Sequence, residues 1–216
     1  MPQTLELLDV SLETLPPAAY EFSEIWKQKL TIFQGEKVLV TAPSGKGKSS
    51  LIALLYGLRR IYTGTYRILG NDSRQFSAAQ WSATRAETIS VVFQDLRLFM
   101  DYTGWENLAI KGKLPGAVYD ENSIRIMADH LGIEPLLQKK CNTLSYGERQ
   151  RLAIIRSLLM PAAFLIMDEP FSHLDETNTA KALELIDSEA SKNGSAVVMT
   201  SLGSSYGWSF DRNVHL

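Results

Sequence analysis

A glycine-rich octapeptide stands between a short apolar run and an amphipathic helical pattern, and this arrangement restricts the fold more than any other feature. The run covers residues 37–41, the octapeptide residues 42–49, and the helical pattern residues 49–60. The run predicts a β-strand, and the pattern predicts a helix that begins where the glycines end. A strand, a glycine-rich turn and a helix in this order are typical of a phosphate-binding loop.

Two more apolar runs, at residues 163–167 and 195–200, are continuous rather than alternating. Such runs predict strands that are buried on both faces, as in a parallel sheet under helices. Helical patterns follow the octapeptide and recur at residues 147–160 and 177–192. Alternating strands and helices therefore predict an α/β core.

Two regions break this alternation. Short strand-like segments within residues 1–35 and 61–70 predict an antiparallel sheet beside the core. Residues 100–143 are helical and polar in pattern, and we expect an inserted helical lobe over roughly residues 95–150. The expected helix breaks in this region are Gly112, Pro115 and Gly116.

Length and composition limit the class of protein. The chain has 216 residues and a net charge of −2, which fits a single domain over residues 1–216 and argues against a nucleic-acid binder. Its single cysteine, Cys141, cannot form an internal disulfide, and this favours the cytoplasm. The longest apolar stretch, at residues 158–167, is too short to cross a bilayer, and the N-terminus lacks the basic head of a secretory signal.

The octapeptide matches the phosphate-binding pattern except at its first position, where alanine replaces glycine. Gly45 and Gly47 allow backbone N–H groups to turn toward phosphate oxygens, and the helix dipole adds to this attraction. We expect Lys48 to neutralise the β- and γ-phosphates and the Ser49 hydroxyl to hold Mg²⁺. The expected nucleotide-binding residues of this loop are Ala42, Pro43, Ser44, Gly45, Lys46, Gly47, Lys48, Ser49 and Ser50.

Two carboxylates, Asp168 and Glu169, follow the apolar run at residues 163–167. Ligands of open α/β sheets bind at the carboxyl ends of the strands. We expect Asp168 to hold Mg²⁺, directly or through water, and Glu169 to polarise an attacking water. The alternative is an unrelated pair of surface acids, which the phosphate-binding loop upstream makes the weaker interpretation.

Residues 144–151 open a helix in a way that allows two interpretations. Ser145 and Glu148 have the spacing of a capping box, which explains them structurally. The hydroxyl of Ser145 and the N–H of Gly147 could instead meet an anion at the helix N-terminus. Both can hold, because a cap satisfies only some of the free donors.

With these motifs the sequence resembles the ATP-binding cassette (ABC) ATPases over nearly its whole length. The segment LSYGE at residues 144–148 resembles the family signature, with Tyr146 at a position that is often glycine. Gln94 resembles the Q-loop glutamine, and residues 172–175 resemble the D-loop. The resemblance implies a P-loop NTPase (RecA-like) core with an antiparallel β subdomain and an inserted α-helical subdomain. Residues 93–98 look most like the lipoprotein-release, macrolide-export and cell-division group.

The resemblance also implies a mechanism. Two cassettes, identical or different, would pair head to tail and hold ATP between one P-loop and the partner's signature. Gln94 would serve both catalysis and the Mg²⁺ site within one chain, whereas Ser145 and Gly147 would reach the ATP of the other cassette and Asp175 would cross the interface. With the Q-loop, the helical lobe would receive an integral membrane permease, which places the chain peripherally at the inner face of the cell membrane.

Two positions depart from the family pattern. Ser201 stands where the family usually has a histidine, and a serine can hydrogen-bond a γ-phosphate but carries no charge. We therefore expect slow hydrolysis or one weak site, and the alternative is that a neighbouring group substitutes for the histidine. The adenine-stacking aromatic of the family is also absent near Thr14, so Tyr20 is the nearest candidate, while simple packing of Tyr20 in the β region is an equal alternative.

Three classes of function remain after this comparison. The leading hypothesis is the ATP-hydrolysing subunit of a membrane transporter, with ATP and Mg²⁺ as cofactors. The alternative is a mechanical or regulatory ATPase of a cell-envelope complex that moves no substrate. Cassettes that act on DNA or ribosomes usually carry long coiled-coil insertions or two cassettes in one chain, and this sequence has neither feature.

Overall fold

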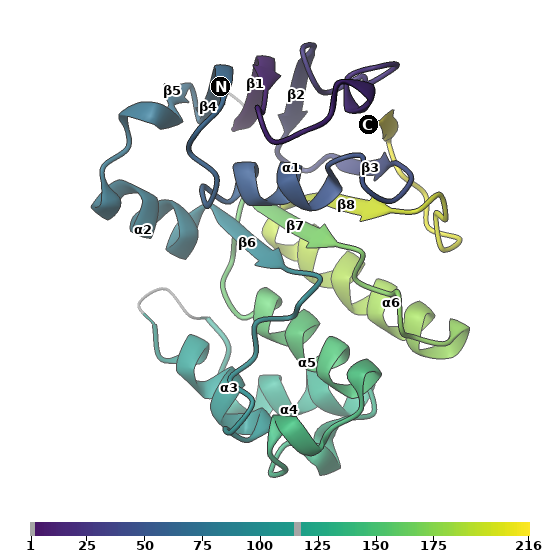
Figure 1. Ribbon diagram of the computed structural model, residues 1–216. Helices are drawn as coiled ribbons and strands as arrows, with labels where there is room; N and C mark the ends of the chain where they lie inside the picture. The colour runs from purple at the N-terminus through teal and green to yellow at the C-terminus, as the bar shows by residue number, and fades with distance from the viewer. Residues whose placement is uncertain (1–2, 115–117) are drawn as a thin grey trace.

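The computed structural model describes residues 3–114 and 118–216, so two of the expected helix breaks, Pro115 and Gly116, lie outside the described residues. A parallel sheet with the strand order β6-β7-β8-β3-β9 forms its centre (Figure 1). Its strands are β3 (Lys37–Thr41), β6 (Ile89–Val92), β7 (Phe164–Asp168), β8 (Ala196–Ser201) and β9 (Arg212–His215). The three strands predicted from apolar runs are present, each within one residue of its expected bounds.

The parallel sheet is buried on both faces, which explains why its strands read as continuous apolar runs. Leu39 and Met167 belong to a cluster with α5 (Tyr146–Leu158) and α6 (Glu176–Asn193) on one face. The neighbouring residues Val38 and Ile166 belong to a second cluster on the other face. Successive side chains of a strand point to opposite faces, so a strand between two covered faces is apolar at consecutive positions.

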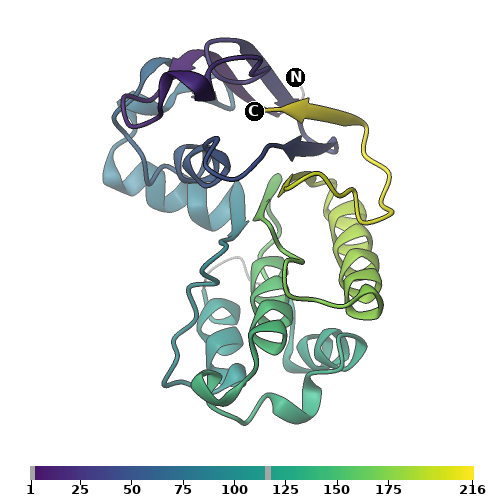
Figure 2. The same cartoon turned by 45° about the vertical axis from the view of Figure 1, so that its right-hand side comes forward.

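An antiparallel sheet lies beside the parallel one, as the sequence predicted (Figure 2). Its order is β2-β1-β4-β5, with β1 (Thr4–Ser11), β2 (Lys29–Phe33), β4 (Thr63–Ile68) and β5 (Asn71–Asp72). The second cluster joins this sheet to α1 (Lys48–Leu55) and to the parallel sheet. This packing fixes α1, and with it the glycine-rich loop, against both sheets.

Helix α1 ends earlier than the sequence pattern predicted. Gly57 turns the chain at φ +73°, and the ring of Trp81 lies 2.2 Å from the place where a Cβ would stand. A side chain at this position would clash with the ring, and the left-handed φ of Gly57 takes the chain out of the helix. Trp81 belongs to α2 (Ala78–Glu87), a helix that the sequence pattern did not indicate.

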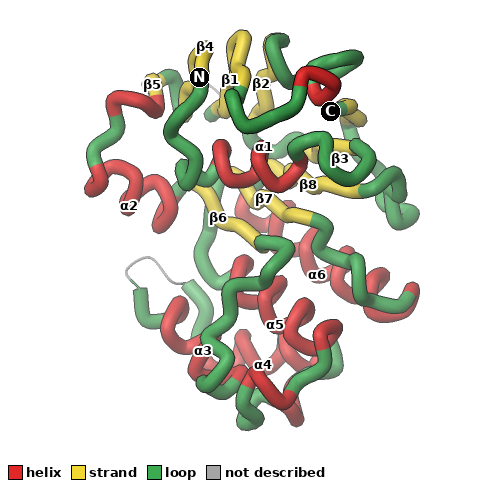
Figure 3. Tube along the Cα trace, viewed as in Figure 1, coloured by secondary structure: helices red, strands yellow, loops and turns green. Residues whose placement is uncertain are grey.

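The remaining helices gather on one side of the molecule, away from the antiparallel sheet (Figure 3). They are α3 (Gly104–Gly112), α4 (Glu121–His130) and the first part of α5. Capping boxes at Thr103 and Ser145 begin α3 and α5, and Asp120 caps α4. Within residues 3–114 and 118–216, no helix is both long and apolar enough to cross a membrane.

Candidate nucleotide site

The P-loop, residues 42–49, forms a cradle at the carboxyl edge of the parallel sheet. Gly45 and Gly47 adopt φ values of +81° and +101°, which residues with a side chain rarely accept. The first turn of α1 carries N–H groups that have no partner within the helix. A cavity of about 400 Å³ opens here, and it is lined by Leu15, Ser44, Gly45, Gly47, Lys48, Ser49, Ser50, Gln94, Glu169 and Leu202.

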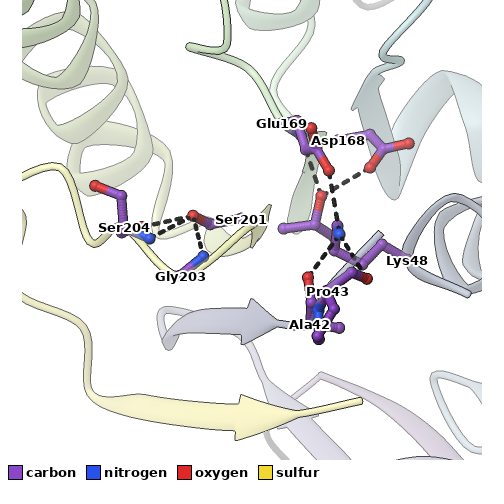
Figure 4. A network of polar contacts seen from close by, with 9 residues as sticks. Ala42, Pro43, Lys48, Asp168, Glu169, Ser201, Gly203 and Ser204 are labelled. Atoms are coloured by element: carbon purple, nitrogen blue, oxygen red, sulfur yellow. Dashed lines mark hydrogen bonds and ion pairs between the residues drawn. The ribbon is translucent and has the colours of Figure 1, made fainter. Parts of the chain in front are cut away.

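The Lys48 side chain is 6% exposed and its ammonium group is surrounded by oxygen (Figure 4). It donates to the carbonyls of Ala42 at 2.7 Å and of Pro43 at 3.2 Å. It also lies 3.3 Å from a carboxylate oxygen of Glu169. A buried charge is tolerated only when such partners offset its lost hydration, so the geometry holds Lys48 as a cation at the edge of the cavity.

Asp168 ends β7 and is 3% exposed. The hydroxyl of Thr200 donates to its carboxylate at 2.7 Å. Burial raises the pKa of Asp168, and hydrogen bonds from Ser49 and Thr200 partly oppose this rise. A carboxylate and a hydroxyl oxygen thus lie within hydrogen-bonding reach of each other, and oxygen ligands of this kind suit Mg²⁺.

Glu169 reaches the cavity from a strained backbone. Its φ is +48°, a left-handed conformation that costs a residue with a side chain about 1–2 kcal/mol. Its N–H donates to the Thr200 hydroxyl at 3.0 Å, and its carbonyl accepts from the Gln150 side chain at 3.3 Å. These bonds fix the backbone on both sides of the side chain, so the carboxylate is held next to Lys48.

Ser201 ends β8 beside Thr41 of β3, and its side chain is fully buried. Its hydroxyl donates to the Ser204 carbonyl at 2.7 Å and accepts from the N–H groups of Gly203 at 3.2 Å and Ser204 at 2.9 Å (Figure 4). Serine therefore closes its own turn. From this loop it is Leu202, 63% exposed, that lines the cavity. Contact between Ser201 and a γ-phosphate stays a prediction, and it would require the hydroxyl to leave these bonds.

Tyr20 is not among the residues that line the cavity. Its hydroxyl donates to the Leu12 carbonyl at 2.5 Å and accepts from the Leu12 N–H at 3.0 Å, and the Lys27 ammonium lies 4.8 Å from its ring centroid. This geometry favours the packing interpretation over adenine stacking. Leu15 lines the cavity instead, one residue from Thr14. Because leucine is not aromatic, nothing in the sequence indicated that this residue lies at the nucleotide site.

Gln94 and Lys46 occupy different places around the cradle. Gln94 follows β6 and lines the cavity together with Ser49. The Lys46 ammonium instead donates to the Ala18 carbonyl at 2.6 Å, and the residue is not among those that line the cavity. We therefore expect Lys46 to contribute its backbone rather than its charge.

Ser145, Gly147 and Asp175 are not among the residues that line the cavity of their own chain. Ser145 caps α5, and Asp175 caps α6 through the N–H of Asn178 at 2.8 Å. A Cβ at Gly147 would lie 3.0 Å from the His173 carbonyl, so the start of α5 approaches the D-loop closely. Capping accounts for Ser145 and Asp175 within the chain, and their contact with a second cassette stays a prediction.

Comparison with known proteins identifies this arrangement of P-loop, paired carboxylates and helical lobe. The family model described as ABC transporter matches residues 27–172, which is more than half of the chain. The chain belongs to the ABC transporter family. As a member, the cassette is an ATP-binding subunit of the ABC type and an ATPase, as the motifs predicted.

Several relatives resemble the cassette over most of its length. The lipoprotein-releasing system ATP-binding protein LolD of Bacteroides fragilis is 32% identical, and the match covers 87% of the cassette and 88% of that protein. The thiamine import ATP-binding protein ThiQ of Histophilus somni is 33% identical over 73% of the cassette and 72% of its own length. The macrolide export ATP-binding/permease protein MacB of Rhodopseudomonas palustris is 33% identical over 79% of the cassette but only 26% of MacB.

Solved structures agree on the fold. A dimeric ATP-binding cassette in a post-hydrolysis state with ADP and Pi has a TM-score of 0.82 to this structure, at 24% identity, over 98% of the cassette and 94% of that chain. An ATP-bound bacterial exporter of the Atm1 family has a TM-score of 0.80, at 22% identity, over 100% of the cassette and 37% of that chain. The predicted combination of an α/β core, an antiparallel sheet and a helical insertion is thereby confirmed.

Proposed function

We propose that the cassette is the ATP-hydrolysing subunit of a membrane transporter of the group that includes lipoprotein-releasing and macrolide-export systems. The observation that carries this proposal is the buried Lys48 ammonium between the P-loop carbonyls and Glu169, next to Asp168. A cation held at the edge of a cavity of about 400 Å³ is ready to exchange a carbonyl for a phosphate oxygen. The relatives named for lipoprotein release and macrolide export favour transport over a purely mechanical role.

Mg²⁺ would bind at the Ser49 hydroxyl and the Asp168 carboxylate, with Gln94 nearby. Ser49, Gln94 and Asp168 line the same hollow beside the P-loop. Bound there, the ion would neutralise phosphate charge. Burial raises the pKa of Asp168, and the hydrogen bond from Thr200 partly offsets this rise and orients the carboxylate for the metal.

Glu169 is the proposed residue that polarises the attacking water, and Gln94 is the proposed partner that orients it. Both line the cavity, and the carboxylate of Glu169 lies against Lys48 at 3.3 Å. Binding of phosphate at Lys48 would release this carboxylate toward water. Hydrolysis is expected to be slow, because the Ser201 hydroxyl is committed to its own turn.

A second cassette would complete the site. Ser145 and Gly147 begin α5, and only part of the N-terminal donors of this helix is consumed by the cap. In a head-to-tail pair these donors would meet the γ-phosphate on the partner cassette, and Asp175 would lie at the interface. The dimeric cassette among the similar structures supports such a pair.

A membrane-embedded permease is the proposed partner outside the pair, which would place the cassette at the inner face of the cell membrane. A hollow of about 590 Å³ lies between the P-loop and the helical lobe, and its lining includes Phe93, Gln94, Arg97 and Tyr146. Nearby Phe99, on the segment that follows, is 53% exposed. An apolar, partly open surface of this kind suits a helix that a partner inserts beside the Q-loop.

Affinity purification from the native membrane tests the function. The tagged cassette would be recovered from detergent-solubilised membranes of its own source, and co-purifying proteins would be identified by mass spectrometry, with an untagged strain as control. We expect a protein with several membrane-spanning helices at a fixed ratio to the cassette. Recovery with only soluble partners, ribosomes or nucleic acid would contradict the proposal.

A further inference from the structure

The Q-loop, residues 93–98, contains two neighbouring residues in a strained conformation. Leu96 has φ +59° and Arg97 has φ +47°, both in the left-handed region that side chains disfavour. Leu96 is 4% exposed and packs in the cluster with α5, while the guanidinium of Arg97 stacks on the ring of Phe93 at 3.9 Å. Such a backbone persists only where surrounding contacts determine it.

Helix α5 supplies these contacts from two points along its length. At its first residue, the Tyr146 hydroxyl donates to the Gln94 carbonyl at 2.5 Å. Nearly three turns further on, the Arg156 guanidinium donates to the Leu96 carbonyl at 2.6 Å and to the Arg97 carbonyl at 2.8 Å. Three carbonyls of the strained segment therefore accept bonds from one helix.

The N-terminal end of α5 also contacts the D-loop. The ring of Tyr146 lies 4.2 Å from the ring of His173, centroid to centroid. The Gln150 side chain donates to the Glu169 carbonyl at 3.3 Å and to the Ser172 hydroxyl at 3.4 Å, and it accepts from the His173 N–H at 3.3 Å. The start of α5 thus touches the Q-loop on one side and the D-loop on the other.

We infer that α5 is a clamp on the Q-loop, and that Tyr146 is the positioning residue that couples the signature end of this helix to Gln94. A glycine at position 146 could make neither the hydroxyl bond nor the ring contact. Because Tyr146 follows Ser145 directly, a shift of the signature end of α5 would move the backbone that carries the Gln94 side chain. This inference rests on the proposed function, since it assigns a coupling role within the same ATP site.

Packing alone is the competing explanation for Tyr146, because its ring also lies against the hydrophobic cluster of the helical lobe. The two explanations differ in what the hydroxyl does. Tyr146→Phe keeps the ring and removes only the bond to the Gln94 carbonyl. Tyr62→Phe is the matched control, since it removes a tyrosine hydroxyl bonded to Ser73 at 2.8 Å, in the antiparallel region.

The first test compares both variants with the wild type. For Tyr146→Phe we expect kcat for ATP to fall about 3- to 10-fold, the worth of one hydrogen bond, with Kd for ATP changed less than about twofold. Amide hydrogen exchange in residues 93–98 should become faster, because the strained segment loses one of its holds. Tyr62→Phe should change neither kcat nor the amide exchange of residues 93–98. Unchanged exchange in residues 93–98 of Tyr146→Phe would overturn the clamp.

The second test is a double-mutant cycle with Gln94→Ala, which removes the side chain but keeps the carbonyl that Tyr146 bonds. If Tyr146 acts through the Gln94 side chain, Tyr146→Phe should no longer lower kcat in the Gln94→Ala background. An equal fold-reduction in both backgrounds would overturn the inference and leave packing as the role of Tyr146. Absence of ATP binding by the wild type would instead contradict the proposed function itself, so the two failures are distinguishable.

Discussion

Two neighbouring loops leave the same edge of the parallel sheet and use their polar groups in opposite ways. The loop after β3 opens on a cavity, with Gly45 and Gly47 in left-handed conformations and Lys48 held by backbone carbonyls. The loop after β8 begins beside it, at the pairing of Thr41 with Ser201, and closes on itself through the Ser201 hydroxyl.

The difference separates binding from turnover. A loop that keeps its donors available can take up the charge of a triphosphate. A loop that uses the Ser201 hydroxyl for its own turn presents Leu202 to the cavity and adds no charge there. We therefore expect the cassette to bind ATP and to hydrolyse it slowly.

Among the variants considered, removal of the Lys48 charge from the loop after β3 should change ATP binding the most. Lys48→Ala is expected to weaken Mg²⁺-ATP binding about 100-fold, because a charge-assisted contact with phosphate is lost. Isothermal titration of the purified cassette measures this change, with Lys29→Ala, an exposed lysine on β2, as the control. Equal Kd values for the two variants would show that the cradle does not bind the nucleotide.

Acid should weaken the Mg²⁺-dependent part of binding. Because burial raises the pKa of Asp168, its contribution to the stability of the nucleotide-free fold is complete at low pH and is lost as the pH rises through the raised pKa. Mg²⁺ needs the ionised carboxylate, so its affinity should fall about tenfold per pH unit below that pKa. Thermal shifts with Mg²⁺-ATP at a series of pH values check this, and Asp168→Asn should show no such dependence.

A histidine at position 201, in the loop after β8, should speed the hydrolysis of ATP bound at the loop after β3. Ser201→His cannot keep the turn bonded as serine does, and its ring would extend toward the cavity. We expect kcat to rise about tenfold, the value of one hydrogen bond to a charged group. Steady-state ATPase assays test this at saturating Mg²⁺-ATP, and an unchanged or lower kcat in a stably folded variant would count against the expectation.

The smallest expected effect concerns the contact with the adenine base of ATP. Leu15 lines the cavity one residue from Thr14, near which the resemblance places a stacking aromatic, so Leu15→Tyr should tighten ATP binding about 2- to 10-fold. Tyr20→Ala should leave Kd for ATP unchanged, because Tyr20 is bonded to the Leu12 backbone. A large loss of affinity in Tyr20→Ala would restore the stacking assignment.

The sequence predicted the loop after β3 better than the loop after β8, for a physical reason. Glycines with special backbone angles and apolar runs buried on both faces leave a local pattern, and β3, β7 and β8 accordingly appear within one residue of expectation. Strands β6 and β9 were not predicted. Both have only four residues, and β9 is mostly polar, with a single buried side chain.

Contacts between distant segments also left no local signal. The Ser201 hydroxyl could have faced a phosphate or its own turn, and only the fold decides between them. Leu15 reaches the cavity because the antiparallel sheet and α1 share one core, and a leucine in the sequence does not indicate such a contact. The bond from Tyr146 to Gln94 joins residues 52 positions apart, so only the packed helical lobe reveals it.

Single-turnover hydrolysis by Ser201→Ala distinguishes a structural role of the Ser201 hydroxyl from a catalytic one. The variant removes only the hydroxyl, and the rate of ATP cleavage would be measured with the cassette in excess over ATP, beside wild type. If the hydroxyl only closes its turn, we expect slow cleavage at an unchanged rate, together with a modest loss of thermal stability from the broken turn. Fast cleavage by wild type that collapses in Ser201→Ala would contradict this expectation, because the hydroxyl would then act on the phosphate.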